Sequence, residues 1–201
     1  MKEWDERLDE FRMDNRGKVV ACRVKVISVE EACRMFGQPL EPGDKVFRVV
    51  KGRFFDEDEA HLETWIEVDA ALPDGSRAVN EAALHGWPRE ELPEMAPECP
   101  VRDSLADGPA KFFMGGGNFA PKTALDLGPY WVAIEGKSDI AVGFGLPGNR
   151  HVCYSIAYEQ QRWGVEEERV EEEKEVEEVK GELTGEWIFD LRITGTIRRK
   201  E

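Results

Sequence analysis

Hydrophobic and polar residues alternate along much of this chain with a period of two, the spacing of half-buried β-strands. The clearest alternation runs from 62 to 70 and ends at the turn Pro73-Asp74-Gly75-Ser76. β-branched and apolar runs predict further strands over 18–29, 45–55 and 111–114. The first half of the chain is therefore expected to be rich in strands.

The second half shows the same signal at regular intervals. Segments 130–135, 140–146 and 151–159 are separated by two turn sequences, 136–139 and 147–150, and together predict an antiparallel meander. The apolar face that we expect to form its core comprises Tyr130, Val132, Ile134, Ile140, Val142, Phe144, Leu146, Val152, Tyr154, Ile156 and Tyr158. A last alternating segment predicts a strand over 186–197.

Helical signals are fewer. Trp4, Leu8 and Phe11 fall at i, i+4 and i+7, which predicts an amphipathic helix over 3–14. Ser28 and Glu31 have the spacing of a capping box for a short helix that ends at Gly37. Residues 77–85 leave two alternatives, a returning hairpin strand or a short helix, and their alanines favour the helix.

These elements predict an α+β, β-rich fold. We expect an antiparallel barrel or sandwich of about eight strands, with two or three peripheral helices. The length of 201 residues suits a single domain, 1–201. Five prolines fall between 88 and 109, which makes this loop a possible sub-boundary.

Charge narrows the classes of partner. The formal net charge is -15, and nine glutamates stand against three basic residues between Val165 and Lys180. The negative potential of these charges repels nucleic acid and anionic lipid, so we expect no direct nucleic-acid binding. The same potential attracts basic proteins or cations. The residues that we expect to contact a basic protein partner are Glu171, Glu172, Glu173, Glu175, Glu177 and Glu178.

Other compositional features bear on the protein's location. No stretch approaches the roughly 20 apolar residues that span a bilayer, and the first residues have no signal-peptide pattern, so we expect a cytoplasmic protein. Four widely separated cysteines predict reduced thiols. Asn and Gln total only seven beside abundant Glu and Arg, a composition typical of thermophiles.

The second face of the predicted meander is a candidate ligand site. Glycines within strands permit close approach by a ligand, and polar groups lie near them. The residues concerned are Trp131, Glu135, Gly143, Gly145, His151 and Cys153. In the alternative interpretation, the glycines accommodate a packed helix such as 3–14. His151 and Cys153 would share one strand face and could ligate a metal or form a nucleophile–base pair.

Two other segments contain residue types found in binding sites. Asp56, Asp58 and His61 are candidate ligands for a divalent metal, although a run of acids in a loop is more often only solvated. The segment 116–123 approaches a phosphate-binding loop, but Pro121 replaces its second glycine. No cofactor is predicted beyond the possible divalent metal.

The sequence favours a binding function over catalysis, and no catalytic residue is assigned. The leading hypothesis is an acidic binding or inhibitory protein that engages a basic partner through its Glu-rich surface. One alternative is a small β-barrel enzyme or ligand-binding protein that uses the glycine-lined sheet face. Another is a structural subunit of an oligomeric assembly, with Trp65 or Trp163 among its apolar contacts.

Overall fold

The computed structural model shows a mostly β protein with two five-stranded sheets. It describes residues 3–13, 17, 19–21, 23–86, 101–114, 128–147 and 150–165. All of these residues belong to one compact unit, Met1–Glu166. Among the described strands, the two sheets remain separate and do not close into one barrel.

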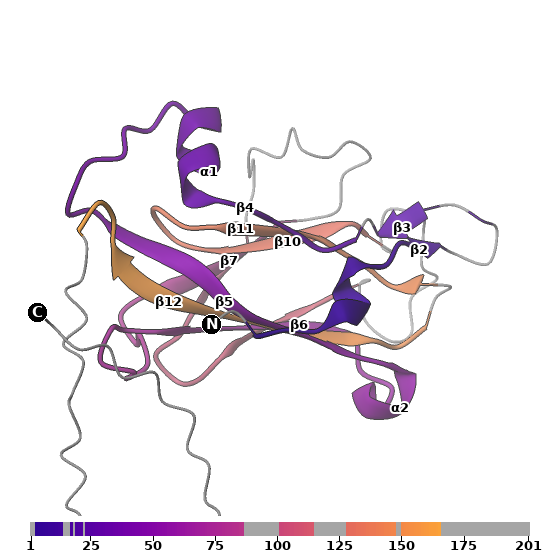
Figure 1. Cartoon of the computed structure of the whole chain (residues 1–201). Coiled ribbons are helices and arrows are strands. Elements are labelled where there is room, and N and C mark those ends of the chain that lie inside the picture. The colour runs from indigo at the N-terminus through magenta and orange to yellow at the C-terminus, as the bar shows by residue number, and fades with distance from the viewer. Residues whose placement is uncertain are drawn as a thin grey trace, which may run out of the picture. The chain divides into compact units, whose positions relative to one another are not determined.

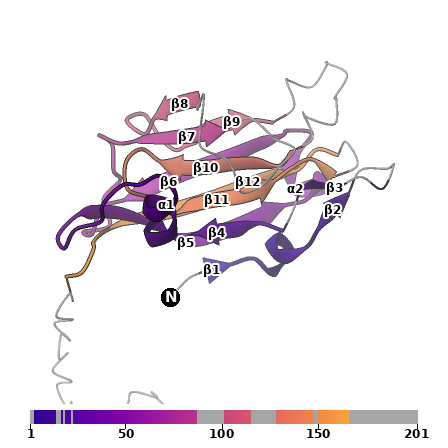
Figure 2. The ribbon, with the colours of Figure 1, turned by 90° about the horizontal axis from the view of Figure 1, so that it is seen from above.

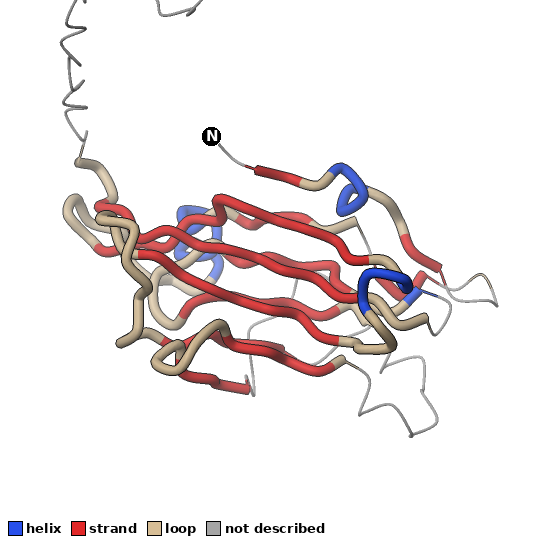
Figure 3. Tube along the Cα trace, turned by 90° about the horizontal axis from the view of Figure 1, so that it is seen from below, coloured by secondary structure: helices blue, strands red, loops and turns tan. Residues whose placement is uncertain are grey.

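The first sheet has β5 and β12 near its centre and contains the longest strands (Figure 3). Its order is β1 (Glu3–Trp4), β5 (Lys45–Phe55), β12 (Cys153–Arg162), β6 (Trp65–Ala71) and β9 (Ala110–Phe113). The second sheet has the order β4 (Lys25–Ile27), β11 (Ile140–Phe144), β10 (Tyr130–Ile134), β7 (Ala82–Gly86) and β8 (Val101–Ser104). A small ribbon pairs β2 (Arg12–Met13) with β3 (Val19–Ala21).

The two sheets lie face to face with the main core between them (Figure 1). Three buried tyrosines, Tyr130, Tyr154 and Tyr158, are among its largest side chains. The hydroxyl of Tyr158 in the first sheet donates to the carbonyl of Val132 in the second sheet at 3.0 Å. Alternating inward residues thus bury a common apolar layer, as the pattern of half-buried strands requires.

Helices lie outside this layer. The N-terminal segment has a single 3-10 turn, η1 (Glu6–Asp9), and the described α-helices are α1 (Val29–Met35) and α2 (Glu57–Ala60). Helix α1 covers part of the outer face of the second sheet (Figure 2). The Ser28 half of the predicted capping box is confirmed, since the Ser28 hydroxyl accepts from the backbone N–H of Glu31 at 3.3 Å. The helix ends before Gly37, whose φ is positive.

The prediction of a three-stranded meander is wrong for its last strand. β10 and β11 pair as predicted, but β12 belongs to the other sheet, antiparallel to β5 and parallel to β6. The chain therefore crosses between sheets after β11. Turn sequences fix where strands end, but they do not fix which neighbour a strand chooses.

The predicted facing of β11 is wrong in the first part of the strand, while Phe144 and Leu146 are in the core as predicted. Ala141 and Phe144 point into the main core, whereas Ile140 and Val142 lie on the outer face. The register between β10 and β11 shifts near Gly143, whose φ is 102°. This bulge inserts an extra residue and reverses the alternation, a conformation that glycine adopts readily.

The predicted helix over 3–14 is wrong as well. Glu3 and Trp4 instead pair in parallel with the edge of β5, opposite Lys51 and Gly52. Leu8 is fully buried, while Phe11 is 59% exposed. The hydrogen bonds that this segment forms with the edge of β5 therefore outweigh the helical spacing of Trp4, Leu8 and Phe11.

Residues 77–85 form no helix either. Ala82–Gly86 is strand β7, which pairs with β10 and β8. Its alanines occupy a sheet that is covered on both faces, where small residues fit. The strand expected over 186–197, most of the 88–109 loop and the glycine loop at 116–123 lie outside the described residues. The single-domain assignment stays a prediction.

Candidate ligand-binding site

The six residues predicted to line a glycine-rich pocket are not all brought together. Trp131 is on β10 and Glu135 follows it, while Gly143 and Gly145 lie in and just after β11. Cys153 is the first residue of β12, in the other sheet, and His151 precedes that strand. The crossing of β12 thus separates the polar pair from the tryptophan that was expected to be its wall.

Two of these residues have structural partners. Glu135 is exposed and forms an ion pair with Arg102, with 2.8 Å between Oε2 and Nη2. The Cys153 thiol is buried and accepts from the backbone N–H of Trp65 at 3.5 Å. Burial raises the pKa of this thiol to about 11, so it is protonated at neutral pH and is a weak nucleophile.

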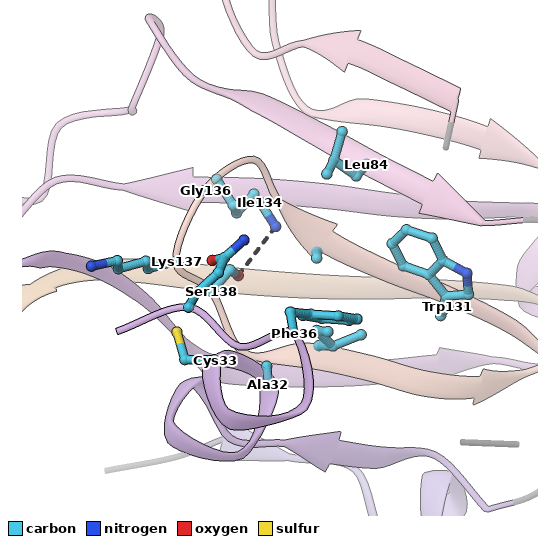
Figure 4. Close-up of a pocket in the computed structure, with 12 residues that line it drawn as sticks. Ala32, Cys33, Phe36, Leu84, Trp131, Ile134, Gly136, Lys137 and Ser138 are labelled. Carbon is cyan, nitrogen blue, oxygen red and sulfur yellow. Dashed lines mark hydrogen bonds between the residues drawn. The ribbon is translucent and has the colours of Figure 1, made fainter. Parts of the chain in front are cut away.

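Trp131 instead lines a pocket of about 320 Å³ between α1 and the outer face of the second sheet (Figure 4). The apolar part of the wall is built from both elements. It comprises Ala32 and Phe36 from α1 and its C-terminal end, and Leu84, Trp131, Ala133 and Ile140 from the sheet. This volume is at the lower end of the range for small-molecule sites, which are mostly apolar with a few polar groups.

Small side chains leave space in the pocket. The α1 side contributes Ala32, and the sheet side contributes Ala133, both of them buried members of one apolar cluster. Trp131 is 3% exposed, and its indole lies directly over Gly86 on β7. A Cβ on Gly86 would come within 1.5 Å of Trp131 Nε1, so glycine is required for this ring position.

The pocket is polar at one end. Figure 4 shows Gly136, Lys137 and Ser138 on the opposite side of the pocket from Trp131. Ser138 is satisfied internally, because its hydroxyl accepts from Ile134 N–H at 3.2 Å and donates to the Asp139 carbonyl at 2.7 Å. Lys137 Nζ forms an ion pair with Asp44.

Helix α1 is held in place by two carboxylates. Asp139, 5% exposed, accepts from the backbone N–H groups of Val29 at 2.8 Å and Val49 at 2.9 Å. Glu30 pairs with Arg48, and the hydrogen bonds from this guanidinium hold the pKa of Glu30 at about 2. These contacts tie the first turn of α1 to β5 and to the residue that precedes β11, and so fix one wall of the pocket.

The other predicted site residues have different surroundings. Asp56 caps α2, with its carboxylate accepting from the N–H groups of Asp58 and Glu59, and His61 follows the helix with a positive φ. Within the described ranges, no group of three or more His, Cys, Asp or Glu residues is arranged to hold a metal ion. The divalent metal at Asp56, Asp58 and His61 stays a prediction. The six partner-binding glutamates, 171–178, lie outside the described residues.

A second groove, of about 470 Å³, lies on the outer face of the first sheet, over Ala157 and beside the turn at 72–75. Two of its charged residues, Asp69 and Arg77, are paired, with 3.0 Å between Oδ1 and Nε and 3.3 Å between Oδ2 and Nη2. The groove provides a control position for experiments on the first pocket.

Comparisons with protein-family models, curated proteins and solved structures find no significant match to this chain. In the part of the chain that the structure describes, no helix is both long and apolar enough to cross a membrane.

The residues that form the pocket are visible in the sequence, but their arrangement around a common space is not. Ala32 and Phe36 belong to the correctly predicted helix, but nothing in their spacing shows which sheet face they cover. The glycine that matters most for Trp131 is Gly86, which directly follows the segment 77–85 whose alanines favour a helix. A glycine that ends an apolar segment is also what a strand shows when a neighbouring aromatic ring lies across it.

Proposed function

We propose that this protein binds a small, mainly apolar molecule in the pocket between α1 and the outer face of β10 and β11. The observation that carries the proposal is the pocket itself. Its apolar wall includes a buried tryptophan, and small residues on both sides leave the centre open. The proposal keeps the ligand-binding class that the sequence offered as an alternative, but the site differs, because only Trp131 of the six predicted residues lines this pocket.

A cavity-filling pair of variants tests the proposal. Ala133→Leu adds three carbons to the pocket wall, and Ala157→Leu makes the same change in the groove on the other sheet. We expect a small molecule to co-purify with the native protein and with Ala157→Leu, detected by native mass spectrometry, and to be lost from Ala133→Leu. Equal retention by both variants, with unchanged far-UV circular dichroism, would contradict the proposal.

A second candidate is the engagement of a basic protein through the Glu-rich run, supported by the net charge of -15 and nine glutamates between 165 and 180. Binding of this kind weakens as salt is added, because screening shortens the range of the field. Replacing Glu171, Glu172, Glu173, Glu175, Glu177 and Glu178 by glutamine should abolish it. Salt-independent binding would count against this candidate.

The oligomeric-subunit alternative has one supporting observation. Phe113, on the edge strand β9, is 61% exposed and lies opposite the half-buried Trp65 of β6. Trp163, by contrast, packs near α1 and donates to Glu30 at 3.1 Å. If a second copy covers the Phe113 surface, Phe113→Ser should yield a monomer in light scattering, whereas an unchanged mass would refute the idea.

A further inference from the structure

The pocket offers no available charge to a ligand. Its ionisable side chains are Lys137 and Cys33, and Lys137 is already paired with Asp44. Burial raises the pKa of the Cys33 thiol, which therefore stays protonated and neutral. Placing an ion beside these groups would remove its hydration without supplying a counter-charge, which is strongly unfavourable.

The pocket has few groups that can form a hydrogen bond with a ligand, and they lie at one end. The Ser138 hydroxyl is engaged by Ile134 and Asp139, so its donor is not available to a ligand. Gln38 also lines the pocket, and its backbone N–H donates to Cys33 at 2.8 Å, which places it beside the end of α1. The Gln38 side chain is exposed, so its amide can both donate to and accept from a ligand at the mouth of the pocket.

The apolar end favours a flat molecule. Trp131 and Phe36 are both aromatic, and Phe36 packs against the buried cluster that contains Trp131. Figure 4 shows Trp131 on the opposite side of the pocket from Lys137. Aromatic faces pack well against planar rings in offset or tilted geometry. Ala32 and Ala133 leave room beside these rings without adding polar groups.

From these observations, and resting on the proposed function, we infer the ligand's chemical class. The geometry points to an uncharged, planar molecule about the size of two fused rings, with a single hydroxyl or carbonyl group. Its ring system packs against Trp131 and Phe36, and its polar group forms a hydrogen bond with Gln38. A carboxylate or ammonium finds no free counter-charge in the pocket, because Lys137 is already paired with Asp44.

Three probes of one shape test this assignment: 2-naphthol, 2-naphthoate and naphthalene. We expect calorimetry on the full chain at neutral pH to show 2-naphthol binding at least about tenfold more tightly than 2-naphthoate. Gln38→Met keeps the length of the side chain and removes the amide. It should weaken 2-naphthol about fivefold and leave naphthalene unchanged, since one neutral hydrogen bond is lost.

The results distinguish an error in the chemical class of the ligand from an error in the location of its binding site. If 2-naphthoate binds as tightly as 2-naphthol, or if Gln38→Met leaves 2-naphthol unchanged, the ligand class is wrong while the pocket remains a binding site. No binding of any probe also overturns the class. If binding survives Ala133→Leu and is lost in Ala157→Leu, the molecule sits elsewhere and the proposed function fails.

Discussion

His85 should make the stability of this fold depend on pH between about pH 7 and pH 4. Its ring is 3% exposed in the main core and stacks between Phe112, at a centroid distance of 4.9 Å, and Tyr130, at 5.2 Å. Burial lowers the pKa of His85 from 6.5 to about 4. The folded protein therefore resists protonation of an imidazole that the unfolded chain protonates readily.

The sign and size follow from linkage. Between the two pKa values the unfolded chain binds more protons than the folded chain, so the free energy of unfolding falls as the pH falls. His85 costs nothing above its unfolded pKa, and the full loss, about 3 kcal/mol, is reached below its folded pKa. Integration from pH 8 to pH 5 gives a loss of about 2 kcal/mol.

His85→Phe isolates this contribution, because it keeps a ring between Phe112 and Tyr130 but cannot take a proton. Urea unfolding at several pH values should show wild type losing about 2 kcal/mol more than His85→Phe between pH 8 and pH 5. His61→Asn, which removes an exposed imidazole at a positive-φ position, is the matched control for the loss of a histidine. Parallel pH profiles for wild type and His85→Phe would refute the reasoning.

Three further changes probe the pocket and its supports. Gly86→Ala should destabilise the protein by about 1–3 kcal/mol in urea unfolding, because the new Cβ would overlap the Trp131 ring; a loss of equal size in the background Trp131→Leu would contradict that cause. Asp139→Asn should cost about 2 kcal/mol, since one of two buried backbone N–H groups loses its charged acceptor, and a change below about 0.5 kcal/mol would refute this. Ser28→Ala should cost about 1 kcal/mol by thermal melting, as loss of a helix cap does, whereas an unchanged melting temperature would show that the cap contributes nothing.

The sequence predicts an element correctly where the residues of that element alone determine its conformation. The strand over 45–55 has the bounds of β5, and the cap at Ser28 begins α1 as its spacing predicts. The chain is mostly antiparallel and β-rich, as the alternation indicates. These features depend on side-chain period and on short-range hydrogen bonds, which are visible in one sequence.

The remainder depends on contacts between distant segments. Trp4 lies in a sheet because its segment pairs with the edge of β5. Strand β12 pairs with β5 and β6, although β11 is the strand that precedes it in the chain. The bulge at Gly143 then decided which residues of β11 face the helix. The pocket is built by α1, β7 and β10, so its location could not be derived before these pairings were known.

The most direct test of the proposed site is to measure intermolecular nuclear Overhauser effects between bound 2-naphthol and the alanine methyl groups of the labelled protein. A ligand between α1 and the sheet must contact both walls, so we predict cross-peaks to the methyl groups of Ala32 and Ala133 together. Cross-peaks to Ala157 alone, or contacts with neither wall, would contradict the account.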